Sequence, residues 1–124
     1  MSTETMKREL YQSIAKVAQA LASGNRLQLL EFMAQGERSV DALAAMAGVT
    51  VANASQHLQA LRRAGLVAAR KEGQRVYYRV AGDDVVRLYD GLRVVAESRL
   101  AEVDRKSTRL NSSHRSVSRM PSSA

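Results

Sequence analysis

One segment of the chain, residues 51–64, carries amide and hydroxyl side chains at the spacing of a helix face. Ala54, Leu58 and Leu61 recur at spacings of three and four, which predicts a helix with one buried side. At about 100° per residue, the outer side carries the following residues, with Ser55 at its flank: Ala52, Asn53, Gln56, Gln59 and Arg63. Asn and Gln pair bidentately with adenine in the major groove, and Ser and Thr donate to bases or phosphates. The segment is therefore a candidate base-reading helix, and the alternative for each single residue is an ordinary solvated helix face.

Basic residues are concentrated at the end of this helix and just after it. Residues 51–80 contain six of them against Glu72 alone, a net charge of +5. The stretches Leu66–Lys71 and Arg75–Val80 are rich in Val, Tyr and Arg, and the link around Gly73 suits a tight hairpin between two strands. Arg75, nearest to the tip, is expected to reach a minor groove or a phosphate. The alternative is a solvated strand edge whose cations discourage aggregation.

The base-reading helix needs a neighbouring helix to hold it. Ser39 followed by residues 41–46 predicts a short helix, with serine as its cap and Gly48 at its end. Thr50 is then the expected N-cap of the base-reading helix. Two short helices joined by three residues form a helix-turn-helix.

Longer helices are predicted on both sides of this motif. Residues 4–21 show the apolar spacing of one helix face, and Asn25 is expected to cap a second helix that stops at Gly36. A final helix is expected from Asp83 or Asp84 to Val103, with a narrow apolar stripe at spacings of three and four. Such a stripe suits a helix that pairs with another helix. The sequence predicts a mainly α fold with a small two-stranded antiparallel β wing.

Composition excludes several classes of function. The 124 residues contain no cysteine, so a disulfide framework and a thiolate metal site are excluded. No apolar run approaches the roughly 20 residues of a membrane span, so we expect a cytoplasmic protein without a membrane partner. His57 and His114 are the only histidines and neither stands in a nucleophile–base pattern, so no catalytic residue and no enzyme is predicted.

Residues 105–124 differ in kind from the rest. They hold seven serines and five basic side chains without an acid, and thus most of the net charge of +7. We expect a disordered tail after a domain of residues 1–104. KSTRLNSSH resembles a translated sequencing adaptor, so the tail is expected to be foreign and the natural chain to continue past Asp104. The alternative is a native basic tail that binds DNA nonspecifically.

The central motif also resembles a known family. It resembles the ArsR/SmtB family of bacterial repressors. The resemblance is carried by SVDALAAMAGVTVANASQHLQALRRAGLVAARKEGQRVYYRV and by the preceding ALASGNRLQLLEFMAQGERSV. The resemblance covers about residues 8–104. It implies a winged helix-turn-helix that forms homodimers through its first and last helices. Such dimers bind half-sites of a pseudo-palindromic operator in double-stranded DNA with the fourth helix, repress transcription, and release the operator when an inducer binds.

The resemblance also assigns roles to single residues. It implies base contacts from Asn53, Ser55 and Gln56, and it places Thr50 and His57 near the DNA backbone. The wing contact falls on Arg75. The alternative function is a winged helix that binds proteins, or binds DNA as an architectural module without an operator.

Departures from the family pattern concern the sensor. Metal-sensing members carry cysteines on the third helix or histidines on the last, and this chain has neither. Carboxylates without imidazole make a poor zinc or nickel site, so no metal or other cofactor is expected. The segment VVAESRLAEVDR resembles the linker helix of members that continue into a C-terminal rhodanese domain, which would then hold the sensor.

Overall fold

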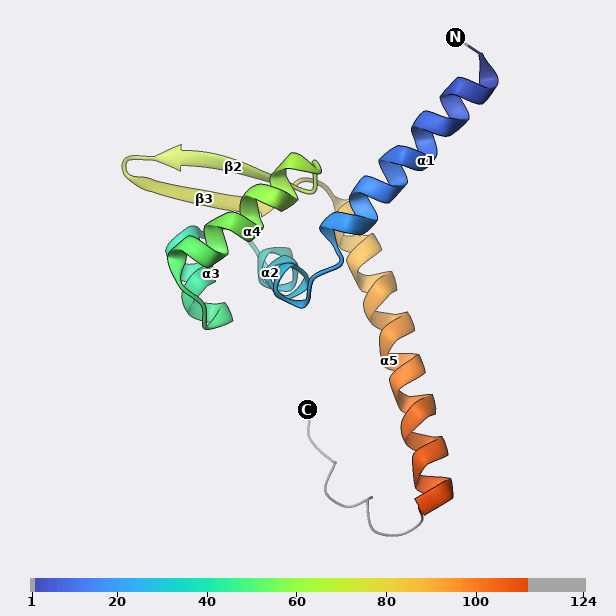
Figure 1. Cartoon of the computed structure of the whole chain (residues 1–124). Coiled ribbons are helices and arrows are strands. Elements are labelled where there is room, and N and C mark those ends of the chain that lie inside the picture. Colours follow the sequence, from blue (N-terminus) through green and yellow to red (C-terminus); the bar gives the residue numbers. More distant parts are fainter. Residues whose placement is uncertain (1, 112–124) are drawn as a thin grey trace. The chain divides into compact units, whose positions relative to one another are not determined.

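The computed structural model describes residues 2–111 and shows a mainly helical fold with one small sheet (Figure 1). In chain order the elements are α1 (Thr3–Ala20), α2 (Gly24–Ala34), β1 (Arg38–Ser39), α3 (Val40–Ala47), α4 (Val51–Arg63), β2 (Val67–Glu72), β3 (Arg75–Val80) and α5 (Asp83–Asn111). The chain divides into two compact units, Met1–Tyr89 and Asp90–Ala124. The predicted mainly α fold with a β wing is confirmed.

The helix-turn-helix is formed by α3 and α4, and its caps are those that the sequence predicts. The Ser39 hydroxyl accepts from the Ala42 amide at 3.1 Å, and the Thr50 hydroxyl accepts from the Asn53 amide at 3.0 Å. Gly48 ends α3 with a φ of 70°, a left-handed conformation that suits glycine. The cap of α2 was predicted wrongly: Ser23, rather than Asn25, accepts from the Arg26 amide at 3.3 Å. Both types cap well, and only the position of the first turn decides between them.

The wing is the hairpin of β2 and β3, whose register runs from Val67 opposite Val80 to Glu72 opposite Arg75. Gly73 turns the chain at the tip with a φ of 62°. The sheet has a third strand that the sequence did not indicate, because β1 pairs antiparallel with β3 in the order β1-β3-β2. Two residues are too few to show a period of two, so β1 gives no strand pattern. The predicted two-stranded wing is therefore part of a three-stranded sheet.

A single hydrophobic core in the first unit holds α4 in place. Its largest fully buried side chains come from three helices: Leu29, Leu30, Leu43, Leu58 and Leu61. Ala54 of α4 and Tyr78 of β3 are also buried. The predicted buried face of the base-reading helix is thus confirmed, and the opposite face is turned away from the core.

The last helix continues further than expected. We predicted an end near Val103, whereas α5 extends to Asn111. No glycine or proline follows Gly91 until Pro121, so nothing in this stretch breaks a helix. The part of the predicted disordered tail at residues 112–124 lies outside the described residues. No helix in the described part of the chain combines the length and the apolar composition that spanning a bilayer requires.

Candidate nucleic-acid interface

The outer face of α4 carries most of the predicted site residues. Thr50, Ala52, Gln56, Gln59 and Arg63 are exposed. The other three are half-buried: Asn53, Ser55 and His57. Because all eight lie on or at the start of one helix that is packed through Leu58 and Leu61, the core sets their position. The structure therefore brings the eight residues together on one helix, with Asn53, Ser55 and His57 less exposed to solvent than the other five.

Gln56 and Gln59 are both exposed, but the Gln59 side chain is already engaged in a hydrogen bond. The Gln59 Nε2 donates to the Ser55 hydroxyl at 3.3 Å, one helical turn away. Among the described residues the Gln56 side chain makes no hydrogen bond. Gln56 can therefore present both an acceptor and two donors without breaking an internal contact.

Asn53 lies differently from the expected outward amide. Its Oδ1 is buried and has no hydrogen-bond partner among the described residues. An unsatisfied buried acceptor costs about 1–3 kcal/mol. Asn53 follows Ala52 at the first turn of α4, where its backbone amide is bound by the Thr50 hydroxyl. The side chain would have to rotate outward before it could pair with a base.

His57 is bound to a residue that the sequence did not single out. The Arg26 Nε on α2 donates to the His57 Nδ1 at 3.2 Å, and the Arg26 Nη1 donates to the Ala20 carbonyl oxygen at 3.3 Å. The two residues are 31 positions apart, so neither periodicity nor spacing brings them together. His57 thus has one ring nitrogen tied to the interior of the first unit.

The arginines of the wing have different environments. Arg70 binds the Glu37 carboxylate at 2.8 Å and the Glu72 carboxylate at 2.8 Å, and its guanidinium lies 4.6 Å from the centre of the Tyr77 ring. The hydrogen bonds from Arg70 lower the pKa of Glu37, and those carboxylates raise the pKa of Arg70. Arg75 is exposed and makes no ion pair within the described part of the chain. Arg70 is therefore neutralised locally, whereas Arg75 keeps its charge for a partner.

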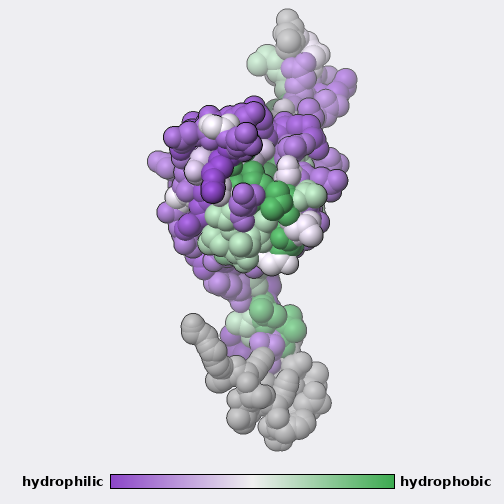
Figure 2. Space-filling view, turned by 90° about the vertical axis from the view of Figure 1, so that its left-hand side faces the viewer, coloured by the Kyte–Doolittle hydropathy of each residue, from purple (hydrophilic) through white to green (hydrophobic). Residues whose placement is uncertain are grey.

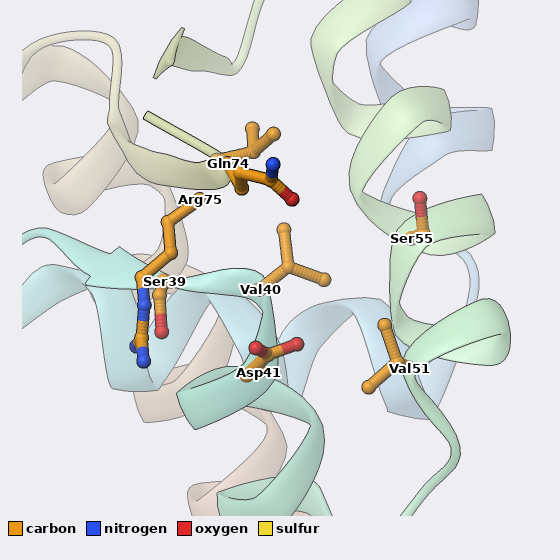
Figure 3. A pocket seen from close by; sticks show the side chains of 8 residues that line it. Ser39, Val40, Asp41, Val51, Ser55, Gln74 and Arg75 are labelled. Atoms are coloured by element: carbon orange, nitrogen blue, oxygen red, sulfur yellow. The ribbon is translucent and has the colours of Figure 1, made fainter. Parts of the chain in front are cut away.

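A pocket of about 220 Å³ separates α4 from the wing. It is lined by Ser39, Val40, Asp41, Val51, Ser55, Gln74, Arg75 and Val76. Figure 3 shows Arg75 extending from the wing toward the start of α3, with Ser55 and Val51 on the opposite wall. Figure 2 shows apolar surface in the middle of this side of the first unit, bordered by hydrophilic surface. The pocket is thus lined by three valines together with five polar or charged side chains.

The acidic side chains do not form a metal centre in the part of the chain that the structure describes. No group of three or more His, Cys, Asp and Glu residues there is placed to hold an ion.

Comparisons with known proteins place the chain in a family. Residues 23–69 match the family described as "Bacterial regulatory protein, arsR family". An HTH-type transcriptional regulator of Mycobacterium tuberculosis is 52% identical over 97 residues, which are 78% of this chain and 43% of that protein. The biofilm growth-associated repressor of Agrobacterium fabrum is 38% identical over 82 residues, 66% of this chain and 70% of the repressor. The chain thus spans less than half the length of the Mycobacterium tuberculosis relative.

Solved structures agree with these similarities. The solution structure of a homodimeric winged helix-turn-helix DNA-binding domain from Mycobacterium bovis is 49% identical, with a TM-score of 0.73 over 81% of this chain and 91% of that one. The crystal structure of a transcriptional repressor from Xylella fastidiosa is 27% identical, with a TM-score of 0.63 over 77% of this chain and 96% of that one. The fold, the helix-turn-helix residues and the matched sequences agree, and the chain belongs to the ArsR family of bacterial regulatory proteins.

Proposed function

We propose that the chain is a sequence-specific DNA-binding transcriptional repressor that binds a pseudo-palindromic operator as a homodimer and releases it on an inducing signal. The observation that carries the proposal is the outer face of α4, where exposed Gln56 and Gln59 stand beside Ala52 on a helix fixed by the core. A helix of this kind fits the major groove, where amides read adenine and a methyl group contacts thymine.

The proposal gives each predicted site residue a part in binding. Gln56, Asn53 and Ser55 read base edges, with Ala52 and Gln59 beside them, while Thr50 and His57 face the backbone at the start and the flank of α4. Arg63, at the end of the helix, supplies charge toward a phosphate. Arg75 enters the neighbouring minor groove or binds a phosphate, because it is the wing arginine nearest to the tip and is not neutralised.

The pocket between α4 and the wing fits this arrangement. The major and minor grooves are separated by a sugar–phosphate strand, so a protein that places α4 in one groove and the wing in the next must pass that strand between them. The valines of the pocket offer an apolar lining to a deoxyribose, and Ser55 and Arg75 offer donors at the edge. Asp41 lies on the same lining and disfavours a phosphate placed directly over it.

Exposed apolar side chains support the homodimer. On α1 the residues Met6, Leu10, Tyr11 and Ile14 are each 51–60% exposed, and on α5 the residues Leu88, Leu92, Val95 and Val103 are 42–59% exposed. Apolar stripes of this kind on long helices indicate a partner surface. The Mycobacterium bovis relative is described as homodimeric. A second copy of the chain is the partner that would also place two α4 helices on one operator.

The test is a selection of duplexes from a random pool, followed by measurement of Gln56→Ala. The wild-type chain should enrich a pseudo-palindrome and prefer it over random DNA by about 10³ or more. Gln56→Ala should lose operator affinity and keep its affinity for random duplex. Gln28→Ala, an exposed glutamine on α2, is the matched control and should change neither.

An unselective wild-type chain would contradict the repressor proposal and favour the architectural or protein-interaction module. An equal loss of both affinities in Gln56→Ala would contradict base reading by that residue. Loss or gain of expression from a promoter that carries the selected operator separates repression from activation. A protein with this function acts on chromosomal DNA in the bacterial cytoplasm, and the proposal gives it no catalytic step.

A further inference from the structure

The side chain of Arg26 joins three helices of the first unit. Arg26 lies in the first turn of α2 and is half-buried. Its Nη1 donates to the Ala20 carbonyl oxygen at the end of α1, and its Nε donates to the His57 Nδ1 on α4. The guanidinium is planar and its N–H groups have fixed directions, so two such bonds fix its plane. Arg26 therefore restrains the orientation of the His57 ring.

The bond also determines which ring nitrogen carries the proton. A ring nitrogen accepts a hydrogen bond only when it is unprotonated, so a neutral His57 that accepts at Nδ1 carries its proton on Nε2. Nε2 has no partner among the described residues and is not among their buried unpartnered atoms. His57 thus presents one outward N–H donor of defined direction.

The place of His57 on α4 indicates what this donor meets. His57 is half-buried against α2, so it stands at the flank of the outer face, next to exposed Gln56. When a helix enters the major groove, the middle of its outer face meets base edges and its flanks meet the sugar–phosphate strands at the walls. We propose that Arg26 is a positioning residue for DNA binding, which holds His57 so that Nε2 donates to a backbone oxygen. This inference rests on the proposed function.

The first experiment needs no DNA. The exchange of the Arg26 Nε–H with solvent is measured by NMR on the full chain, and its signal is identified by its absence in Arg26→Lys. The signal should exchange slowly in the wild type and in His57→Asn, because the Asn oxygen replaces Nδ1 as the acceptor. In His57→Ala it should exchange as fast as an exposed arginine. Equal exchange in the wild type and His57→Ala would overturn the Arg26–His57 link.

The second experiment measures affinity for a random-sequence duplex of about 30 base pairs, enough for two half-sites one turn apart. His57→Asn keeps the acceptor for Arg26 and loses the outward donor, so its affinity should fall about tenfold. Arg26→Met should lower the affinity for the duplex by a similar factor in the wild-type background. In the His57→Asn background it should lower the affinity no further. The slope of log affinity against log salt should stay unchanged, because Arg26 itself neutralises no phosphate.

Arg38→Met is the matched control, since the Arg38 Nε also donates to a carbonyl oxygen, that of Phe32, at 3.2 Å, and no hydrogen bond among the described residues joins Arg38 to α4. It should leave the affinity unchanged. A lower salt slope in Arg26→Met, or a further loss in the His57→Asn background, would show that Arg26 binds a phosphate directly and would overturn the positioning role. A wild-type chain without affinity for any duplex would overturn the proposed function together with this role, whereas fast exchange alone overturns only the Arg26–His57 link.

Discussion

Replacing Asn53 with alanine should stabilise the fold and weaken operator binding at the same time. The Asn53 Oδ1 is buried without a partner, and such an acceptor costs about 1–3 kcal/mol. Alanine removes the acceptor and is the better helix former by up to about 0.7 kcal/mol. Lost packing of the amide opposes both terms. We therefore expect a net gain of about 1 kcal/mol in the free energy of unfolding.

The assay is urea unfolding of the wild type and the variant at one fixed protein concentration, since dimerisation makes stability depend on concentration. With an m value of about 1–3 kcal/mol/M in urea, about 1 kcal/mol corresponds to a rise of about 0.3–1 M in the urea midpoint. Asn25→Ala is the matched control, because Asn25 is an exposed asparagine in the first turn of α2. It changes helix propensity without relieving a buried oxygen. The difference between the two variants isolates the cost of the unpaired acceptor.

An Asn53→Ala variant that is less stable than the wild type, beside an Asn25→Ala variant that is not, would refute the cost assigned to the buried Asn53 oxygen. That result would mean that the Asn53 oxygen has a partner in solution, such as a bound water. On DNA the expectation is opposite in sign. If Asn53 rotates outward to read an adenine, Asn53→Ala should lose about 1–3 kcal/mol of discrimination at one A·T pair of each half-site.

Three further outcomes are expected. Arg75→Met should weaken binding to random duplex and reduce the salt slope by about one per protomer, whereas Arg70→Met should leave the salt slope unchanged, because Arg70 is engaged by Glu37 and Glu72 and not by a phosphate. The pKa of Glu37 is lowered from 4.5 by Arg70, so its contribution to stability is present above 4.5 and is lost as the pH falls through the lowered value. Urea midpoints should therefore fall less in acid for Glu37→Gln than for the wild type, and the effect should shrink in high salt, since the pair is exposed. Leu10→Asp on α1 and Leu92→Asp on α5 should each shift sedimentation of the full chain from dimer toward monomer, and a folded wild-type monomer at micromolar concentration would contradict the dimer proposal.

The helices and the hairpin were predictable because their signals are local. The apolar spacing of Ala54, Leu58 and Leu61 is a property of consecutive residues, and it predicts both the helix and its buried face. Ser39 and Thr50 act on amides three residues away, so their capping is also readable from the sequence. The cap of α2 was missed because Ser23 and Asn25 are both good capping types, and nothing local separates them.

The chemistry of the site depends on contacts that are distant in sequence. Glu37 and Arg70 are 33 positions apart, and only the sheet brings them together. From the sequence alone, Arg70 is one of the basic residues of the wing. In the structure its charge is paired with the Glu37 and Glu72 carboxylates and is therefore less available to DNA. The strand β1 was missed for the same reason, since its two residues become a strand only through their pairing with Tyr77 and Tyr78.

These differences imply that the amides of α4 contribute unequally to recognition. Leu58 and Leu61 are fully buried, so the backbone of the helix is held by the core and the side chains must do the adapting. Gln59 gives up a hydrogen bond to Ser55 when its nitrogen turns to a base, a loss of about 0.5–1.5 kcal/mol. Asn53 must rotate, but the rotation takes its Oδ1 out of a buried position without a hydrogen-bond partner, so part of the cost of the rotation is regained. Gln56 breaks no internal contact when it meets a base edge, so it should contribute more than Gln59 to the affinity for the correct sequence.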